Sequence, residues 1–133
     1  MKKLEHIGIA VRDLEASNTL YKKLLGTASY KTEEVISEGV KTSFFRMGDS
    51  KIELLQALDK NSPIAQFLEK RGEGVHHIAF AVDDIKVEVE RLKSEGFTVL
   101  NEEPKRGADN KLVVFLHPKS SGGVLVELCQ DIP

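Results

Sequence analysis

The chain has 133 residues, 19 of them basic and 21 acidic, with a formal net charge of -2 and a single cysteine, Cys129. That length suits one domain, or two small half-domains that share a core, and the absence of long charge runs predicts no nucleic-acid partner and no membrane partner. Because no apolar run approaches about 18 residues, no signal segment follows Lys3, and one cysteine cannot form an internal disulfide, we expect a cytoplasmic protein.

The first part of the chain predicts a strand, a helix and three further strands. Residues 3–11 alternate bulky aliphatic residues with small or polar ones, which is typical of a strand. Asp13 is in position to cap a helix over about 14–25, and Gly26 ends it. The extended segments that follow are separated by turn residues and cover about 28–37, 40–47 and 51–57.

A short connecting helix is expected next, because Ser62 can cap it, Pro63 suits the first helical position, and Gly72 suits the end. After this helix, at about 63–71, the same order of elements returns. A strand at 75–82 leads into a helix from Asp84 to about residue 95. The expected strands after it cover 97–100, 111–116 and 124–130, with loops at 104–110 and 117–123.

Each half therefore has the order βαβββ, and a repeat of this size is stronger evidence than any single segment. We expect an α+β fold in one domain, 1–133, built from two tandem modules at about 1–60 and 74–133. The strand that contains His6 matches the strand that contains His77. The segment around Glu53 likewise matches the segment around Glu127.

This matched set of two histidines and two glutamates predicts a metal site. Each residue alone has a simpler explanation: the histidines as hydrogen-bonded structural residues, and the glutamates as solvent-facing strand residues. A carboxylate flanked by aliphatic residues in a strand is costly to bury without a charged partner, and four matched positions under one repeat favour ligands. Imidazole and carboxylate without thiolate suit Co²⁺, Ni²⁺, Zn²⁺, Mn²⁺ or Fe²⁺, and the sequence does not choose among these metals.

Residue size adds a second argument. The face of the strands that carries His6 and His77 holds only small neighbours, whereas the opposite face holds bulky ones. We expect the bulky face to be covered by helices, and the small residues to leave space beside the ligands, as a catalytic metal requires. The small residues are Gly8, Ala10, Ala79 and Ala81.

Several stretches resemble the vicinal oxygen chelate superfamily, which includes glyoxalase I and the extradiol dioxygenases, and are most similar to its methylmalonyl-CoA epimerases. The resemblance covers essentially the whole chain. The stretches are His6-Ile7-Gly8-Ile9-Ala10-Val11, Ile52-Glu53-Leu54-Leu55, Ser62-Pro63-Ile64-Ala65, Gly74-Val75-His76-His77-Ile78, and His117-Pro118-Lys119 with Gly122-Gly123-Val124-Leu125-Val126-Glu127-Leu128. It implies two βαβββ modules whose curved mixed sheet surrounds one divalent metal ion, held by His6, Glu53, His77 and Glu127.

The activity that the resemblance implies is epimerisation of an acyl-CoA thioester, methylmalonyl-CoA, at C2 through an enolate that a divalent cation stabilises. Glu127 and Glu53 are the expected acid and base. Some family members carry a further carboxylate where Thr42 or Ser43 stands here, which leaves Glu53 or a bound water as the second group. Lys105, Arg106 and Lys119 suit the phosphates of coenzyme A; the alternative is that they are solvated loop charges. A homodimer is expected.

Two other functions stay open. Glyoxalase I (lactoylglutathione lyase) uses the same enediolate chemistry on a glutathione hemithioacetal and carries glutamate at the position of Glu53. The five arginines, however, form no obvious cluster for the glutathione carboxylates. The third reading is a non-catalytic small-molecule-binding protein of the same fold, which the complete set of ligands argues against.

Overall fold

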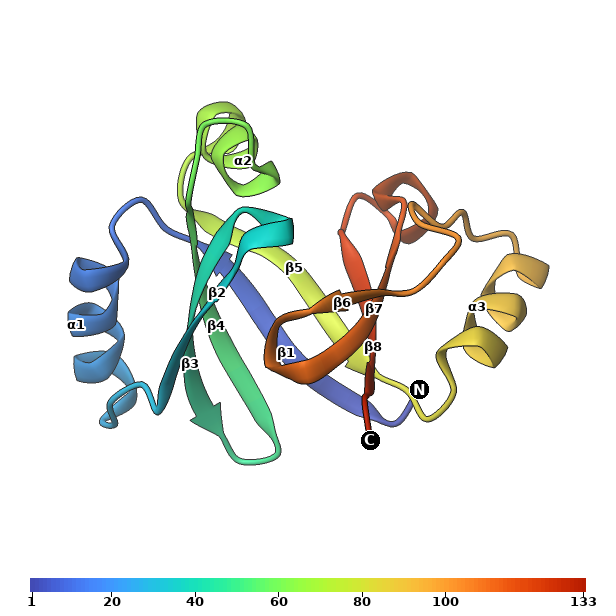
Figure 1. Ribbon diagram of the computed structural model, residues 1–133, viewed down its shortest axis with the longest axis horizontal. Coiled ribbons are helices and arrows are strands. Elements are labelled where there is room, and N and C mark those ends of the chain that lie inside the picture. Colours follow the sequence, from blue (N-terminus) through green and yellow to red (C-terminus); the bar gives the residue numbers. More distant parts are fainter. The chain divides into compact units, whose positions relative to one another are not determined.

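The computed structural model describes residues 1–133 and has an α+β fold, as predicted, with the strand and helix order of two βαβββ modules. It consists of two compact units (Figure 1). Unit 1 comprises Met1–His6 and His77–Pro133, and unit 2 comprises Ile7–His76. Strands β1 (Lys3–Ala10) and β5 (Gly74–Ala81) each contribute residues to both units. None of the helices is long and apolar enough to cross a membrane.

In unit 2 the strands β2 (Lys31–Val35), β3 (Val40–Met47) and β4 (Ser50–Ala57) form antiparallel pairs, and the strand order continues from β4 to β1. Helix α1 (Leu14–Leu25) packs its buried Leu14 against Phe45 and Leu54. Helix α2 (Pro63–Arg71) packs on Leu55 and Val40 instead. Since neighbouring strand residues point to opposite faces, the two helices cover opposite faces of this sheet, as Figure 1 also shows.

Unit 1 contains β6 (Lys105–Gly107), β7 (Lys111–Leu116) and β8 (Val126–Asp131) beside its part of β5. Strand β8 pairs parallel with β5 and antiparallel with β7, and β7 pairs antiparallel with β6. Helix α3 (Ile85–Ser94) covers one face of these strands. Its buried residues Val89 and Leu92 lie in the core cluster of Val114 and Leu128.

The two long helices that follow β1 and β5 begin in the same way. Asp13 accepts a hydrogen bond from the Ala16 backbone N–H at 3.1 Å, and Asp84 accepts one from Val87 at 3.2 Å. Their backbone angles agree, with φ -131° and ψ 103° at Asp13, and φ -132° and ψ 103° at Asp84. Both residues are therefore N-caps, as the sequence predicts.

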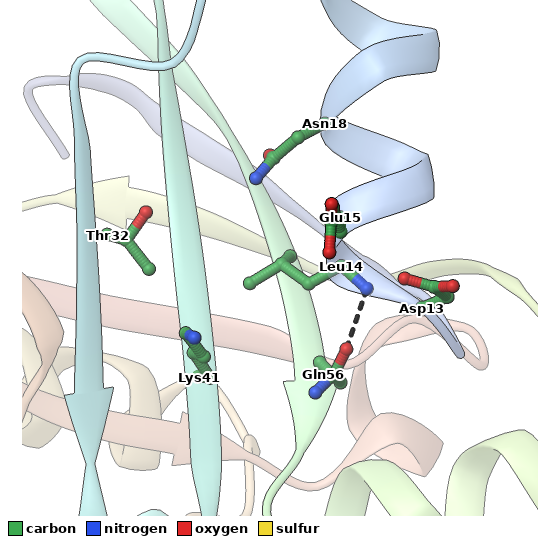
Figure 2. A pocket seen from close by; sticks show the side chains of 7 residues that line it. All are labelled: Asp13, Leu14, Glu15, Asn18, Thr32, Lys41 and Gln56. Atoms are coloured by element: carbon green, nitrogen blue, oxygen red, sulfur yellow. Dashed lines mark hydrogen bonds between the residues drawn. The ribbon is translucent and has the colours of Figure 1, made fainter.

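A glutamine at the end of each module adds a second contact at these helix starts. The Oε1 atom of Gln56 accepts from the Leu14 N–H at 2.6 Å, which Figure 2 shows, and Gln130 accepts from the Ile85 N–H at 2.8 Å. The repeat that relates Glu53 to Glu127 thus also relates these glutamines. In both units one amide side chain satisfies a helical N–H group that has no partner within its own helix.

Two predicted segments differ from the structure. The predicted strand at 97–100 is wrong apart from one isolated bridge, between Val99 and Leu116. The second strand of the second module is instead β6, inside the predicted loop 104–110. The Lys-Arg-Gly sequence of β6 has no apolar alternation, so nothing in it predicts a strand. A tight turn pairs β6 with β7. In this turn Asp109 and Asn110 have φ of 60° and 56°, a conformation that Asp and Asn tolerate.

The predicted segment 28–37 is shorter in the structure, where β2 ends at Val35 and a 3-10 turn, η1 (Ile36–Glu38), follows. Further 3-10 turns lie at Ala108–Asn110 and Pro118–Ser121. All other predicted helices and strands are confirmed, most of them within one or two residues at each end.

Candidate metal centre

Three of the predicted ligands converge in unit 1. The Nε2 atoms of His6 and His77 lie 3.0 Å apart. Glu127 approaches both rings, with Oε1 at 3.3 Å from His77 Nε2 and Oε2 at 3.8 Å from His6 Nε2. All three residues are buried, with exposed fractions of 4%, 5% and 7% for His6, His77 and Glu127. The structure therefore brings two imidazoles and one carboxylate together in the protein interior, and we call His6, His77 and Glu127 the donor set.

Strand pairing places these side chains. His77 lies on β5, which pairs with β8 so that Ala79 stands opposite Glu127. Phe115 on β7 is the other cross-strand partner of Glu127, and its ring packs edge-on against the His77 ring at a centroid distance of 6.0 Å. The Phe115 ring restricts the imidazole, so the orientation of His77 is set by packing as well as by its backbone.

The separations of the donor atoms fit a divalent cation. Metal–nitrogen bonds of about 2.1 Å put neighbouring donors about 3.0 Å apart at right angles and about 3.4 Å apart in a tetrahedron. The observed distances of 3.0 and 3.3 Å fall in that range, and the third, 3.8 Å between His6 Nε2 and Glu127 Oε2, is longer. One metal ion could be held by His6, His77 and Glu127, with coordination positions left open. The chemical type of the three donors, two imidazoles and a carboxylate, also suits a divalent metal.

The fourth predicted ligand, Glu53, belongs to unit 2. It lies on β4, opposite Phe44 of β3, and is 4% exposed. Thr42 and Leu55 form the next pair on the same face of this sheet. The burial of Glu53 is what a ligand or a base would need, and its assignment as a ligand stays a prediction.

Glu5 is a site residue that the sequence analysis missed. Its Oε1 atom lies 2.9 Å from Nδ1 of His6, and the side chain is buried. Lys111 Nζ lies 3.9 Å from the other carboxylate oxygen and also pairs with Asp131. A charged residue immediately before a predicted ligand, at the start of an apolar stretch of strand, was the available signal.

The expectation about small residues is wrong in part. Ala79 is fully buried in a cluster with Val113 and Cys129. Ala10 is fully buried beneath α2. Their size makes room for neighbouring side chains and for a helix rather than for a ligand, because close packing fills such space.

The three predicted substrate-binding residues lie apart from the donor set and are exposed. Lys105 Nζ lies 5.6 Å from the centroid of the Phe115 ring, which itself contacts His77. Arg106 follows Lys105 on β6, so it points to the other face, where it donates to Asn110 Oδ1 at 3.1 Å. Lys119 lies in the 3-10 turn after His117. Of the three, Lys105 is thus connected to the donor set through one aromatic ring.

A depression of about 380 Å³ in unit 2 lies where α1 begins, on the face of the sheet opposite Glu53 (Figure 2). Its lining residues are Asp13, Leu14, Glu15, Asn18, Thr32, Lys41 and Gln56. The N–H groups of Leu14 and Ala16 at this helix start are already bonded to Gln56 and Asp13. The lining has no histidine, so this depression lacks the imidazole groups that the donor set in unit 1 supplies.

Two further polar side chains in unit 2, the half-buried His76 and the buried Thr42, do not belong to the donor set. His76 packs its ring edge-on against Phe67 of α2, with the ring centroids 5.0 Å apart. Burial lowers the pKa of His76 to about 4, so its ring is neutral at pH 7. Thr42 is the one buried residue whose side-chain oxygen has no hydrogen-bond partner, whereas its neighbour Ser43 donates to Asn18 Oδ1 at 2.6 Å.

Comparison with known proteins shows the family of the chain. Residues 5–115 match the family model of the Glyoxalase/Bleomycin resistance protein/Dioxygenase superfamily. The chain belongs to that superfamily.

Within it, the chain is grouped with the methylmalonyl-CoA epimerases. It is 46% identical over 129 residues to the mitochondrial methylmalonyl-CoA epimerase of Homo sapiens, covering 96% of this chain and 73% of that protein. It is also 46% identical over 130 residues to the ethylmalonyl-CoA/methylmalonyl-CoA epimerase of Cereibacter sphaeroides, covering 96% and 97%. A solved structure of a Streptomyces coelicolor methylmalonyl-CoA epimerase variant in complex with 2-nitronate-propionyl-CoA matches with a TM-score of 0.92 at 35% identity, covering 98% of this chain and 95% of that one.

The lowered pKa of His76 predicts a loss of stability in acid. Between pH 6.5 and about 4 the unfolded chain binds a proton on this ring and the folded chain does not, so folding becomes less favourable as the pH falls through that window. In H76F this contribution is absent. Urea unfolding of the metal-free protein measures the free energy of unfolding of H76F and of the original chain at each pH. The difference between the two free energies should be constant above about pH 7.5 and should change in favour of H76F toward pH 4. Parallel pH profiles would contradict the assignment.

The unpartnered hydroxyl of Thr42 predicts opposite effects for two neighbouring substitutions. T42V removes a buried polar group without a partner, and should raise the free energy of unfolding by about 1 kcal/mol. S43A is the matched control, because it breaks the hydrogen bond to Asn18 and should lower that free energy by about 1 kcal/mol. Urea denaturation at pH 7 measures both. A loss of stability in T42V would mean that its hydroxyl is satisfied in solution.

Proposed function

We propose that the chain is a metal-dependent epimerase that inverts C2 of methylmalonyl-CoA through an enolate. The observation that carries the proposal is the buried convergence of His6, His77 and Glu127, in a chain whose named relatives are methylmalonyl-CoA epimerases. Buried imidazole and carboxylate groups in this arrangement are typical of a metal site with open positions.

His6, His77 and Glu127 would hold the ion, and the sequence repeat supports Glu53 as the fourth ligand. A divalent cation held there supplies Lewis-acid stabilisation of the negative charge that develops on the thioester oxygen. Co²⁺, Ni²⁺, Zn²⁺ and Mn²⁺ are all compatible with this donor set. The carboxylates of Glu53 and Glu127 would repel each other without the cation, and binding of the cation would relieve this repulsion. Assembly of the four ligands would therefore depend on metal binding.

Proton transfer is assigned to the two glutamates. Glu127 has two carboxylate oxygens, so one can serve as a ligand while the other accepts the C2 proton. Inversion needs a second group on the opposite side of the substrate, and we assign that role to Glu53. Thr42 cannot replace it, because a hydroxyl is not a base at neutral pH.

The coenzyme A part of the substrate would be bound at the exposed end of unit 1. Lys105 reaches over the Phe115 ring, which contacts His77, so its ammonium group is suited to a phosphate of a ligand whose acyl end reaches the donor set. Arg106 and Lys119 would add charge. The solved epimerase complex with 2-nitronate-propionyl-CoA supports an acyl-CoA ligand for this family.

We also propose a cytoplasmic homodimer. Strand β2 of unit 2 and β6 of unit 1 are edge strands, and exposed edges favour pairing with another chain. Sedimentation velocity at micromolar concentration should give twice the mass of the chain, and a single-chain mass would refute the dimer.

The activity is tested by deuterium exchange. Protein loaded with Co²⁺ and incubated with one epimer of methylmalonyl-CoA in deuterated water should place deuterium at C2, measured by mass spectrometry against a protein-free control. E127Q keeps the side-chain volume but loses the base, and should slow exchange by about 10²–10⁴-fold. E90Q is the matched control, since Glu90 is exposed on α3, and should exchange at the original rate.

Other outcomes separate the alternatives. No exchange, together with turnover of the methylglyoxal–glutathione hemithioacetal, would replace the epimerase by glyoxalase I. Neither activity, with no bound metal, would favour a non-catalytic binding protein. Unchanged exchange in E127Q with the metal retained would remove Glu127 as the base.

A further inference from the structure

We propose that Glu5 is a positioning residue that fixes the tautomer and ring orientation of His6 for metal binding. This rests on the metal site of the proposed function. Glu5 Oε1 lies 2.9 Å from His6 Nδ1, and the exposed fraction of Glu5 is 3%. The contact is short enough for a hydrogen bond to a charged acceptor.

The direction of this hydrogen bond determines which nitrogen can bind a metal. An ionised carboxylate only accepts hydrogen bonds, so Nδ1 of His6 must carry the proton. In the neutral ring the other nitrogen, Nε2, then carries the lone pair. That atom is the one that lies 3.0 Å from His77 Nε2 and 3.8 Å from Glu127 Oε2. Glu5 therefore presents the lone pair of His6 to the donor set.

The surroundings keep the Glu5 carboxylate in place. A buried carboxylate needs compensation, and Lys111 Nζ lies 3.9 Å from Glu5 Oε2. Lys111 is itself paired with Asp131 at the end of β8. The acidic and basic groups thus continue from Asp131 through Lys111 to Glu5 and His6, all within unit 1.

The repeat makes this contact specific to one histidine. The position equivalent to Glu5 in the second module is occupied by His76, whose ring packs on Phe67 in unit 2. The sequence therefore supplies a carboxylate neighbour to His6 and none at the equivalent position before His77. The two imidazole ligands are held differently, and substitution of Glu5 removes the carboxylate acceptor from His6 alone.

Metal affinity is the first test. Zn²⁺ binding would be measured by competition with a chromophoric chelator for the original chain, E5L, E5Q and E88Q. E5L removes the acceptor and should weaken Zn²⁺ binding by about 10–100-fold. E5Q keeps an oxygen acceptor without the charge and should bind more tightly than E5L. E88Q is the matched control, because Glu88 is a paired carboxylate on α3, which supplies no ligand, and its affinity should be unchanged.

The second test observes the ring directly. Long-range ¹H–¹⁵N correlation spectra of metal-free, folded protein should show Nδ1 of His6 protonated in the original chain and in E5Q, and mixed tautomers of His6 in E5L. The His77 tautomer should change together with that of His6, because their Nε2 atoms lie 3.0 Å apart and only one of them can donate. Equal Zn²⁺ affinity and an unchanged His6 tautomer in E5L would overturn the proposal while leaving the metal site intact. Absence of Zn²⁺ binding by the original chain would instead overturn the metal site and this inference with it. If E5L does not fold, E5Q is compared with E88Q instead. Equal Zn²⁺ affinities of these two variants, together with a His6 protonated on Nε2 in E5Q, would overturn the proposal.

Discussion

The chemistry of unit 1 depends on the cost of burying polar groups. Two imidazoles and a carboxylate lie within 4 Å of one another with almost no solvent contact. Such groups are stable in a protein interior only when each has a hydrogen-bond, charge or metal partner. The edge-on ring of Phe115 and the carboxylate of Glu5 each restrain one imidazole, and Lys111 compensates the charge of Glu5. The donor set is thus supported on both sides by side chains that do not themselves belong to it.

The duplication has kept the features that start each helix and changed those that surround the ligands. Asp13 and Asp84 have the same backbone angles and cap in the same way, and both Gln56 and Gln130 accept from a first helical N–H group. These contacts are local or involve adjacent strands, so each module can keep them independently. The residue before each histidine, by contrast, is Glu5 in one copy and His76 in the other. This difference gives the two histidines unequal environments.

The parts of the fold that the sequence predicts well are those with a local cause. Asp13, Ser62 and Asp84 cap helices because their side chains reach backbone N–H groups two or three residues ahead, a property of the local sequence. The strand β6 was missed because Lys-Arg-Gly carries no apolar pattern, and only its pairing with β7 makes it a strand. Ala79 was misread because the size of a side chain does not reveal what fills the space beside it.

The sequence by itself determined the βαβββ order, the helix boundaries and the identity of the four candidate ligands, since periodicity, capping residues and an internal repeat are all properties of the chain. Tertiary structure decided which of them meet: only strand pairing brings His6, His77 and Glu127 within 4 Å of each other. It also decided that Glu5, which lies next to His6 in the chain, bonds to its ring. Alternation along a strand predicts opposite faces for neighbouring residues, but a long, buried carboxylate can bend back to a donor on the adjacent side chain.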